Sequence, residues 1–230
     1  MRTASLILAA AAALTFAGPA VCAPPPVQPV VVELFTSQGC SSCPPADAAL
    51  AQVADRADVI ALSFGVTYWD QLGWKDTFAR PEFTARQKAY ARRLGSAPYT
   101  PQVIAGGRND SVGNSRARIE ALIAKSRGPA ATAISATAAS ATVKAGVAPR
   151  AGADVWLVRY DPHTVRVPVK AGENTGKTLP IRNVVRSLTR LGTWGGGEAT
   201  FRYPAPAAGL DSVVIVQSRD GGPILAAARV

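Results

Sequence analysis

Two cysteines, Cys40 and Cys43, have the spacing of a thiol–disulfide site. They stand in the sequence Cys40-Ser41-Ser42-Cys43, shortly after the apolar run Val-Val-Val-Glu-Leu-Phe at 30–35. A buried strand that leads into a short loop holds two such sulfurs close enough to bond, and a helix that begins there lowers the pKa of the first thiol. The pattern therefore indicates a redox pair, in which one thiolate attacks a disulfide and the other resolves the mixed disulfide.

The order of the two cysteines indicates their roles. Cys40 is the better candidate for the attacking thiol, because it follows the flexible Gly39 at a turn that would expose it. Cys43 would lie deeper and act as the resolving thiol. A structural disulfide is a weaker interpretation, since such a short loop constrains little of the unfolded chain.

A metal site is the other interpretation of this pair. Thiolate zinc sites use four ligands, whereas the chain offers a single histidine and one further cysteine, Cys22. Two thiolates alone would suit copper(I), so a copper-binding module stays open. We predict neither a metal nor a cofactor for the redox site itself.

The N-terminus has the features of an export signal over residues 1–23. Arg2 supplies the positive charge, residues 6–13 form a short apolar run, and Val-Cys-Ala at 21–23 precedes three prolines. The apolar run is too short for a stable membrane span. We therefore expect cleavage near Ala23 and a periplasmic or secreted protein, in a compartment where disulfides persist.

The charge of the chain is strongly positive, at +10 from 25 basic and 15 acidic residues. The basic residues are scattered along the sequence instead of clustered, which is typical of a solvated surface and argues against nucleic-acid binding. The expected partners are protein thiols or a membrane redox partner.

The hydrophobic pattern predicts an α/β domain followed by a smaller, β-rich C-terminal domain. After a lead-in over 24–29, residues 30–127 alternate strands and helices, and strands at 30–35 and 58–64 flank a helix at 46–57. Residues 128–153 indicate a linker and a weak strand, and residues 154–230 are rich in strand patterns. Within them, Asp-Pro-His at 161–163 predicts a turn, and 181–191 fits a helix as well as a strand.

Five further residues could belong to the site. Glu33 lies in the strand before the cysteines, where its carboxylate would relay a proton to or from Cys43, or else reach solvent or pair with a base. Thr100 and Pro101 begin a strand, and the sequence alone favours an ordinary trans bond between them. Trp69 and Tyr99 would rim the site or belong to the core, as aromatic residues more often do.

The sequence resembles the thioredoxin superfamily in three segments, 32–35, 40–43 and 100–101. More narrowly, the chain is similar to a family of secreted bacterial thioredoxin-like proteins that is catalogued as a domain of unknown function. The segments that carry this resemblance are 32–47, 68–76, 83–87, 99–102, 172–177 and 183–186.

The resemblance implies a thioredoxin-like fold for 30–127 with a Cys40–Cys43 disulfide. It implies a cis Pro101 beside that disulfide, with Thr100, Tyr99 and Trp69 as substrate contacts, and it places Glu33 near the buried acid of many superfamily members.

Three features depart from the superfamily pattern. Gly39 replaces the usual aromatic residue, Glu33 is one residue further from Cys40 than the usual acid, and two prolines at 44–45 follow the pair. Prolines supply no backbone donors, so the helix must begin at or near them. The expected function is an exported thiol–disulfide oxidoreductase. A copper-binding module and a non-catalytic interaction module on the same fold are the alternatives.

Overall fold

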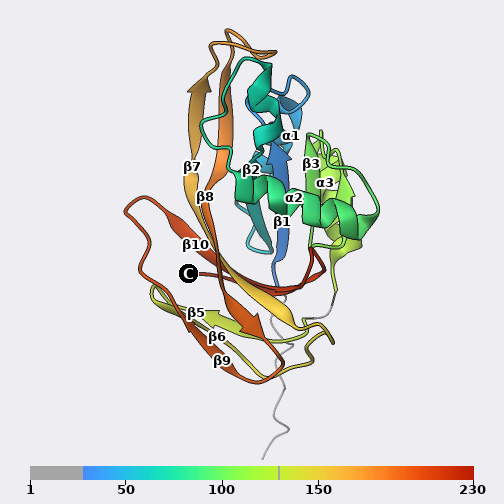
Figure 1. Ribbon diagram of the computed structural model, residues 1–230, viewed down its shortest axis with the longest axis vertical. Coiled ribbons are helices and arrows are strands. Elements are labelled where there is room, and N and C mark those ends of the chain that lie inside the picture. Colours follow the sequence, from blue (N-terminus) through green and yellow to red (C-terminus); the bar gives the residue numbers. More distant parts are fainter. Residues whose placement is uncertain (1–27, 129) are drawn as a thin grey trace, which may run out of the picture.

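The computed structural model describes residues 28–128 and 130–230, so the predicted signal segment lies outside the described part. The protein has a mixed α/β fold with one eight-stranded sheet and one three-stranded antiparallel sheet (Figure 1). The strand order of the large sheet is β11-β10-β7-β8-β2-β1-β3-β4, and that of the small sheet is β5-β6-β9. No helix of the described residues is long and apolar enough to cross a membrane.

The centre of the large sheet is the parallel pair β1 (Val30–Thr36) and β2 (Val59–Gly65). Every residue of both strands is buried, because helices cover both faces. On one face, alternate β1 side chains pack against α1 (Pro44–Ala51) and α3 (Arg116–Ser126). On the other face they pack against α2 (Pro81–Leu94).

Beyond β1, the sheet continues with two short antiparallel strands. β3 (Gln102–Ala105) pairs with β1, and β4 (Asn109–Ser111) forms the edge. A 3₁₀ helix, η1 (Thr67–Leu72), follows β2. The end of β1, the start of α1 and the start of β3 therefore meet at one end of the sheet.

The C-terminal strands extend this same sheet. β7 (Ala153–Pro168) and β8 (Thr178–Trp194) form a long hairpin, and β8 pairs in parallel with β2 at Ser63 and Val184. β10 (Asp211–Ser218) and β11 (Ile224–Arg229) complete the far edge. The sequence predicted a separate β-rich domain after residue 153, but the sheet runs without interruption across that boundary.

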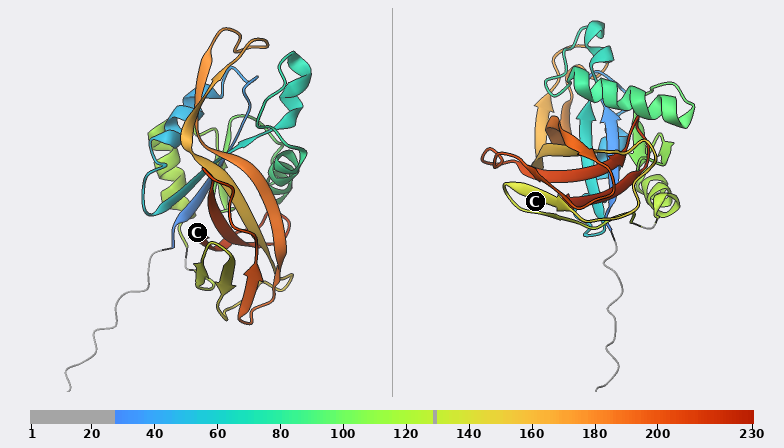
Figure 2. Two further views of the ribbon diagram at one scale, coloured as in Figure 1. Left: turned by 90° about the vertical axis from the view of Figure 1, so that its left-hand side faces the viewer. Right: turned by 60° about the horizontal axis from the view of Figure 1, so that its bottom comes forward.

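The small sheet packs beneath the hairpin. It consists of β5 (Ile134–Ala136), β6 (Ser140–Val143) and β9 (Ala199–Arg202). Its apolar side chains join those of β7 and β10 around the buried Trp194. Figure 2 shows the yellow-to-orange β7–β8 hairpin running from this small sheet to the opposite end of the molecule.

Three local predictions can be compared with the structure. The ambiguous segment 181–191 is strand, because it forms the middle of β8 between β7 and β2. The predicted turn at 161–163 is wrong: β7 continues through it with a shift of register, and a bulge of this kind accommodates a proline inside a strand. The helix expected over 46–57 is shorter and runs from Pro44 to Ala51.

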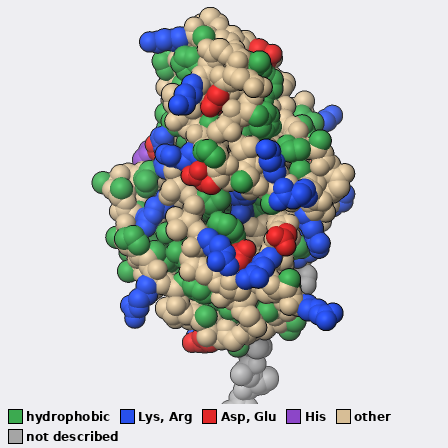
Figure 3. Space-filling view, in the orientation of Figure 1, with side chains coloured by type: hydrophobic (Ala, Val, Ile, Leu, Met, Phe, Trp, Pro, Cys, Tyr) green, Lys and Arg blue, Asp and Glu red, His purple; other side chains and the backbone are tan. Residues whose placement is uncertain are grey.

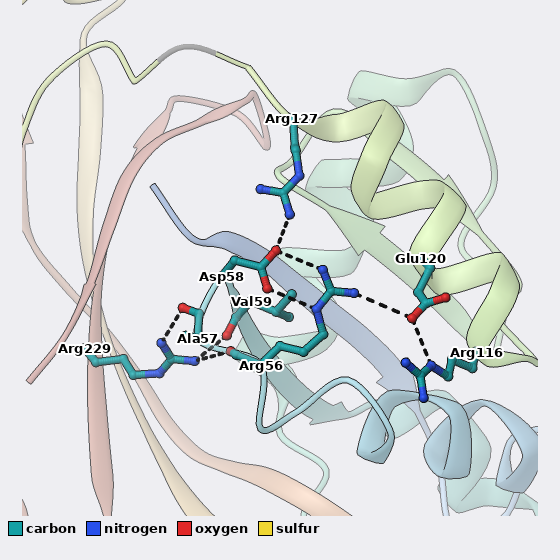
Figure 4. A network of polar contacts seen from close by, with 8 residues as sticks. All are labelled: Arg56, Ala57, Asp58, Val59, Arg116, Glu120, Arg127 and Arg229. Carbon is teal, nitrogen blue, oxygen red and sulfur yellow. Dashed lines mark hydrogen bonds and ion pairs between the residues drawn. The ribbon is translucent and has the colours of Figure 1, made fainter. Parts of the chain in front are cut away.

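Charged side chains are spread over the surface, with acidic residues among the basic ones on the face seen in Figure 3. One network closes the end of the sheet opposite the cysteines (Figure 4). In it, Arg56 and Arg127 both bind Asp58, and hydrogen bonding by Arg56 is the main cause that lowers the pKa of this carboxyl. Arg229 of β11 donates to the carbonyl of Val59 and so ties the last strand to β2.

A buried ion pair crosses the interface between β1 and α2. Glu33 is fully buried, and Arg86 binds its carboxylate through Nε at 2.6 Å and Nη2 at 3.2 Å. Tyr90 also donates to Glu33, and Gln217 of β10 donates to the Tyr90 hydroxyl at 3.0 Å. The pair thereby connects the first strand with the C-terminal part of the sheet.

We predict that Arg86→Leu lowers the free energy of unfolding by about 3–5 kcal/mol, because it leaves a buried carboxylate without its counter-charge. Urea denaturation measures this loss. The matched control is Arg116→Leu, which breaks an exposed pair with Glu120 and should cost less than about 1 kcal/mol. Equal losses in the two variants would contradict the structural role of the buried pair.

Candidate functional site

The candidate site is the loop between β1 and α1, where Cys40 and Cys43 form a disulfide. Their Cα atoms are 5.4 Å apart. The Cys43 N–H donates to the Cys40 carbonyl at 3.2 Å, and Cys43 is the N-cap residue of α1. The helix begins at Pro44 as the proline pair requires, so its first turn lacks two backbone donors that could stabilise a thiolate.

The exposure predicted for Cys40 is wrong. Both cysteines have no exposed surface, whereas Ser41 and Ser42 between them are exposed. Trp69 packs beside Gly39, the residue before Cys40: a Cβ built there would be in van der Waals contact with the Trp69 side chain at 3.6 Å. The disulfide thus lies directly below the surface, under its own loop and its neighbours.

The tip of the β7–β8 hairpin, residues 169–177, forms hydrogen bonds with the cysteine loop. The Asn174 side chain is fully buried, and its Nδ2 donates to the carbonyls of Gln38 at 3.0 Å and Cys40 at 2.9 Å. The carboxylate of the neighbouring Glu173 accepts from the Ser41 N–H at 3.0 Å. The tip can turn so tightly because Gly172 has a positive φ of 76°.

Sequence reasoning missed the function of Glu173 and Asn174 in the site. The segment 172–177 contributed to the family resemblance, yet no local pattern links it to cysteines more than 130 positions earlier. Only the path of the long hairpin brings these residues together.

The loop before β3 closes the site from the other side. The Thr100–Pro101 peptide bond is cis, as the resemblance implies. Trp69 Nε1 donates to Thr100 Oγ1 at 2.8 Å, and Ser42 Oγ lies 3.5 Å from the Thr100 carbonyl oxygen. Trp69, Thr100 and the start of α1 are therefore brought together.

Tyr99 lies beside this loop but its polar groups face away from the cysteines. Its hydroxyl donates to Asp110 of β4, and its carbonyl accepts from Gln87 of α2. The predicted substrate contact for Tyr99 stays a prediction.

Gln38 links the cysteine loop to the segment after η1. Its side-chain oxygen accepts from Trp74 Nε1 at 2.9 Å, and its backbone N–H donates to the buried Asp76 at 2.8 Å. Burial raises the pKa of Asp76, although three backbone N–H donors counteract this effect. The loop is thus fixed from three directions: by the hairpin tip, by the proline loop and by residues 74–77.

The buried acid beside the disulfide is Asp47 of α1. It lies one helical turn after Cys43, and its N–H donates to the Cys43 carbonyl at 3.1 Å. Thr36 donates to one carboxylate oxygen at 3.2 Å, whereas Oδ1 is buried without a partner among the described residues. Burial raises the pKa of Asp47 to about 8, and the nearby Asp76 adds to the rise.

Glu33 does not take the place expected for a proton relay. It lies on the α2 face of the sheet and is bound to Arg86, which is the second interpretation that the sequence allowed. Its position follows from the alternation of β1: Leu34 faces α1, so its neighbour Glu33 faces α2. Asp47 is the buried carboxyl group that stands on the same helix as Cys43, one turn further along.

Comparisons with known proteins agree with this mixed α/β fold. The chain belongs to the family described as "Protein of unknown function (DUF1223)", which matches residues 31–217. No curated protein matches the chain. Among the described residues, no group of three or more His, Cys, Asp or Glu side chains is arranged to hold a metal ion.

Two solved structures are similar to this one. Protein AGR_C_4864 from Agrobacterium tumefaciens is 33% identical, with a TM-score of 0.71, over 87% of this chain and 93% of the other. HBP35 of Porphyromonas gingivalis is 15% identical with a TM-score of 0.55, over 89% of this chain and 75% of the other. The second likeness shows the fold alone.

We predict that the stability of the protein falls as pH rises from about 4 to about 8. Asp47 binds its proton in the folded state up to about pH 8 but loses it near 3.8 when unfolded. The penalty for burying its charge is therefore absent below about pH 4 and complete above about pH 8. Urea unfolding at several pH values should show this decline, and Asp47→Asn should remove most of it. If the stability of Asp47→Asn depended on pH as that of the wild type does, the raised pKa of Asp47 would be contradicted.

We predict that Asn174→Ala makes reduction of the disulfide by dithiothreitol about 30-fold faster. Removing two hydrogen bonds, each worth about 1 kcal/mol, increases the fraction of molecules in which the loop is open. Stopped-flow tryptophan fluorescence measures the reduction rate.

The matched control for this prediction is Ser63→Ala. It removes one buried hydrogen bond from β2 to the Arg182 carbonyl in β8, but no contact to the cysteine loop. Its reduction rate should stay within about twofold of the wild type even though stability falls. Equal acceleration in both variants would show that Asn174 acts through global stability alone.

Proposed function

We propose that this protein is an exported thioredoxin-like thiol–disulfide oxidoreductase that acts on protein or peptide thiols. The observation that carries the proposal is the Cys40–Cys43 disulfide at the start of α1, with the cis Pro101 loop next to it. A redox pair requires two sulfurs that bond reversibly and a neighbouring backbone at which a substrate can dock.

The strand arrangement supports a thioredoxin-like fold. The parallel pair β1 and β2, the antiparallel strands β3 and β4, and helices on both faces are what the resemblance implies for residues 30–127. The added β7–β8 hairpin extends this sheet and contributes residues to the redox site. Fold alone does not define a reaction, so the argument depends on the site.

In the proposed reaction, a substrate thiolate attacks Cys40 Sγ. The Cys40–Cys43 bond breaks, its electron pair stays on Cys43 Sγ, and a mixed disulfide forms on Cys40. A second substrate thiolate then attacks the substrate sulfur of this bond and releases Cys40 as a thiolate. Two substrate thiols become one disulfide while the protein becomes a dithiol, and the reverse sequence reduces a substrate disulfide.

Asp47 is the group that we assign to the proton transfer at Cys43. It lies one turn beyond Cys43, and its raised pKa keeps a proton on the carboxyl near neutral pH. A departing Cys43 thiolate can take up this proton, and the carboxylate can remove it again when Cys43 attacks. Asp47 thus takes the role expected for Glu33, which lies on the α2 face of the sheet and is bound by Arg86.

Export is part of the proposal and is supported by the sequence of residues 1–23. In an oxidising compartment, the disulfide would be the resting form of the protein, and its partners would be protein thiols or a membrane redox partner.

The complete burial of both cysteines favours a second function, a non-catalytic interaction module stapled by a structural disulfide. In that case the loop would stay closed to thiols. The two functions differ in whether Cys40 exchanges with a foreign disulfide.

We predict that reduced Cys43→Ala, mixed with the small disulfide cystamine, accumulates a stable mixed disulfide on Cys40. Without Cys43, no internal thiol can resolve the adduct. Intact-protein mass spectrometry detects it. Cys40→Ala, the matched control, should react far more slowly, and equal or absent labelling of both variants would favour the non-catalytic module.

A further inference from the structure

Glu173 is an exposed carboxylate that contacts the cysteine loop. It accepts a hydrogen bond from the N–H of Ser41, the residue that directly follows Cys40. Hydrogen bonding by the Ser41 side chain and backbone lowers the pKa of Glu173, so the group is charged at neutral pH. Its buried neighbour Asn174 fixes the backbone on which it stands.

The charged side chains that hydrogen bond to the cysteine loop are acidic, although the protein as a whole is basic. Among the described residues, the charged side chains that hydrogen bond to residues 37–43 are Asp76 and Glu173, both acidic. The chain as a whole carries +10. Asp76 is buried, which leaves Glu173 as the acid that an approaching molecule meets first.

Lys177, a basic residue of the hairpin tip, does not neutralise the Glu173 carboxylate by a direct ion pair. Lys177 donates to the side-chain oxygen of Asn174 at 3.0 Å. Within the described residues it forms no ion pair with Glu173, whose contact is the Ser41 N–H. A cationic substrate group can therefore reach the carboxylate from solvent.

We propose that the redox site selects thiols that carry a positive charge beside the sulfur, and that Glu173 is the residue that determines this specificity. The inference rests on the proposed thiol–disulfide exchange at Cys40. The substrate sulfur bonds to Cys40 Sγ as Cys43 leaves, while a neighbouring lysine, arginine or amino group faces Glu173. Anionic thiols are repelled at the same step.

The expected size of this preference is modest and measurable. Opposite unit charges about 5 Å apart in aqueous surroundings change a rate constant by about fourfold, and like charges change it in the reverse direction. Salt at about 1 M screens charges beyond roughly 3 Å, so it should remove most of the difference.

Reduction of the wild-type disulfide by cysteamine, 2-mercaptoethanol and 3-mercaptopropionate tests the inference. Rate constants are expressed per thiolate and compared with those of Glu173→Gln, so that the intrinsic reactivity of each thiol cancels. The ratio of the cysteamine to the mercaptopropionate rate should fall about tenfold in Glu173→Gln. The charge-matched control is Glu198→Gln, which alters an exposed carboxylate just before β9.

A charge reversal and a peptide pair complete the test. Glu173→Lys should favour mercaptopropionate over cysteamine. Acetylated Lys-Cys-Lys and Glu-Cys-Glu amides extend the comparison to peptides, and a preference for the lysine peptide that exceeds the one for cysteamine would identify peptides as the substrate source.

The outcomes separate this inference from the proposed function. An unchanged ratio in Glu173→Gln, or the same fall in Glu198→Gln, would overturn the specificity role and leave the exchange reaction standing. If none of the three thiols reduces the wild-type disulfide, the proposed function fails and the inference fails with it.

Discussion

The cysteine loop of this protein depends on hydrogen bonds that come from a distant part of the chain. A buried loop must satisfy its carbonyl groups, and those of Gln38 and Cys40 are satisfied by the amide of Asn174. Asn174 reaches them because β7 and β8 form a hairpin long enough to span the molecule (Figure 1). The added strands are therefore part of the site and not an appendage to it.

Two of the buried carboxyl groups in the N-terminal part, Glu33 and Asp47, have very different hydrogen-bond partners. Glu33 is surrounded by donors, above all the Arg86 guanidinium, and this pair links β1 to α2. Asp47 has the Thr36 hydroxyl and an unpartnered oxygen, so burial dominates and raises its pKa. Glu33 thus links two elements of the fold, and the raised pKa of Asp47 is what its proposed proton transfer to Cys43 depends on.

Much of the local structure could be predicted from the sequence, because local patterns determine it. The β-branched run at 30–35 and the apolar run at 58–64 predict β1 and β2, and two prolines mark the start of α1. The resemblance added the cis bond at Pro101, which propensity alone did not favour.

The remaining features depend on contacts between distant residues. The C-terminal strands join the large sheet through the pairing of β8 with β2. The hydrophobic periodicity of a sequence does not specify which strands become neighbours. The burial of Cys40 and the contacts of Glu173 depend on where the hairpin tip lies. The position of Glu33 in the sequence also suggested that its carboxylate belongs to the cysteine site. The alternation of side chains along β1 instead directs it to Arg86 of α2.

The reduction potential of the Cys40–Cys43 pair tests the central claim most directly. The protein is equilibrated in dithiothreitol buffers of graded composition, and the oxidised fraction is measured by thiol labelling and mass spectrometry. A redox-active pair should titrate as a two-electron couple with a midpoint above about −300 mV, as catalytic and labile disulfides do. A midpoint below about −300 mV, or a pair that stays oxidised until the protein unfolds, would identify a structural disulfide and contradict the account.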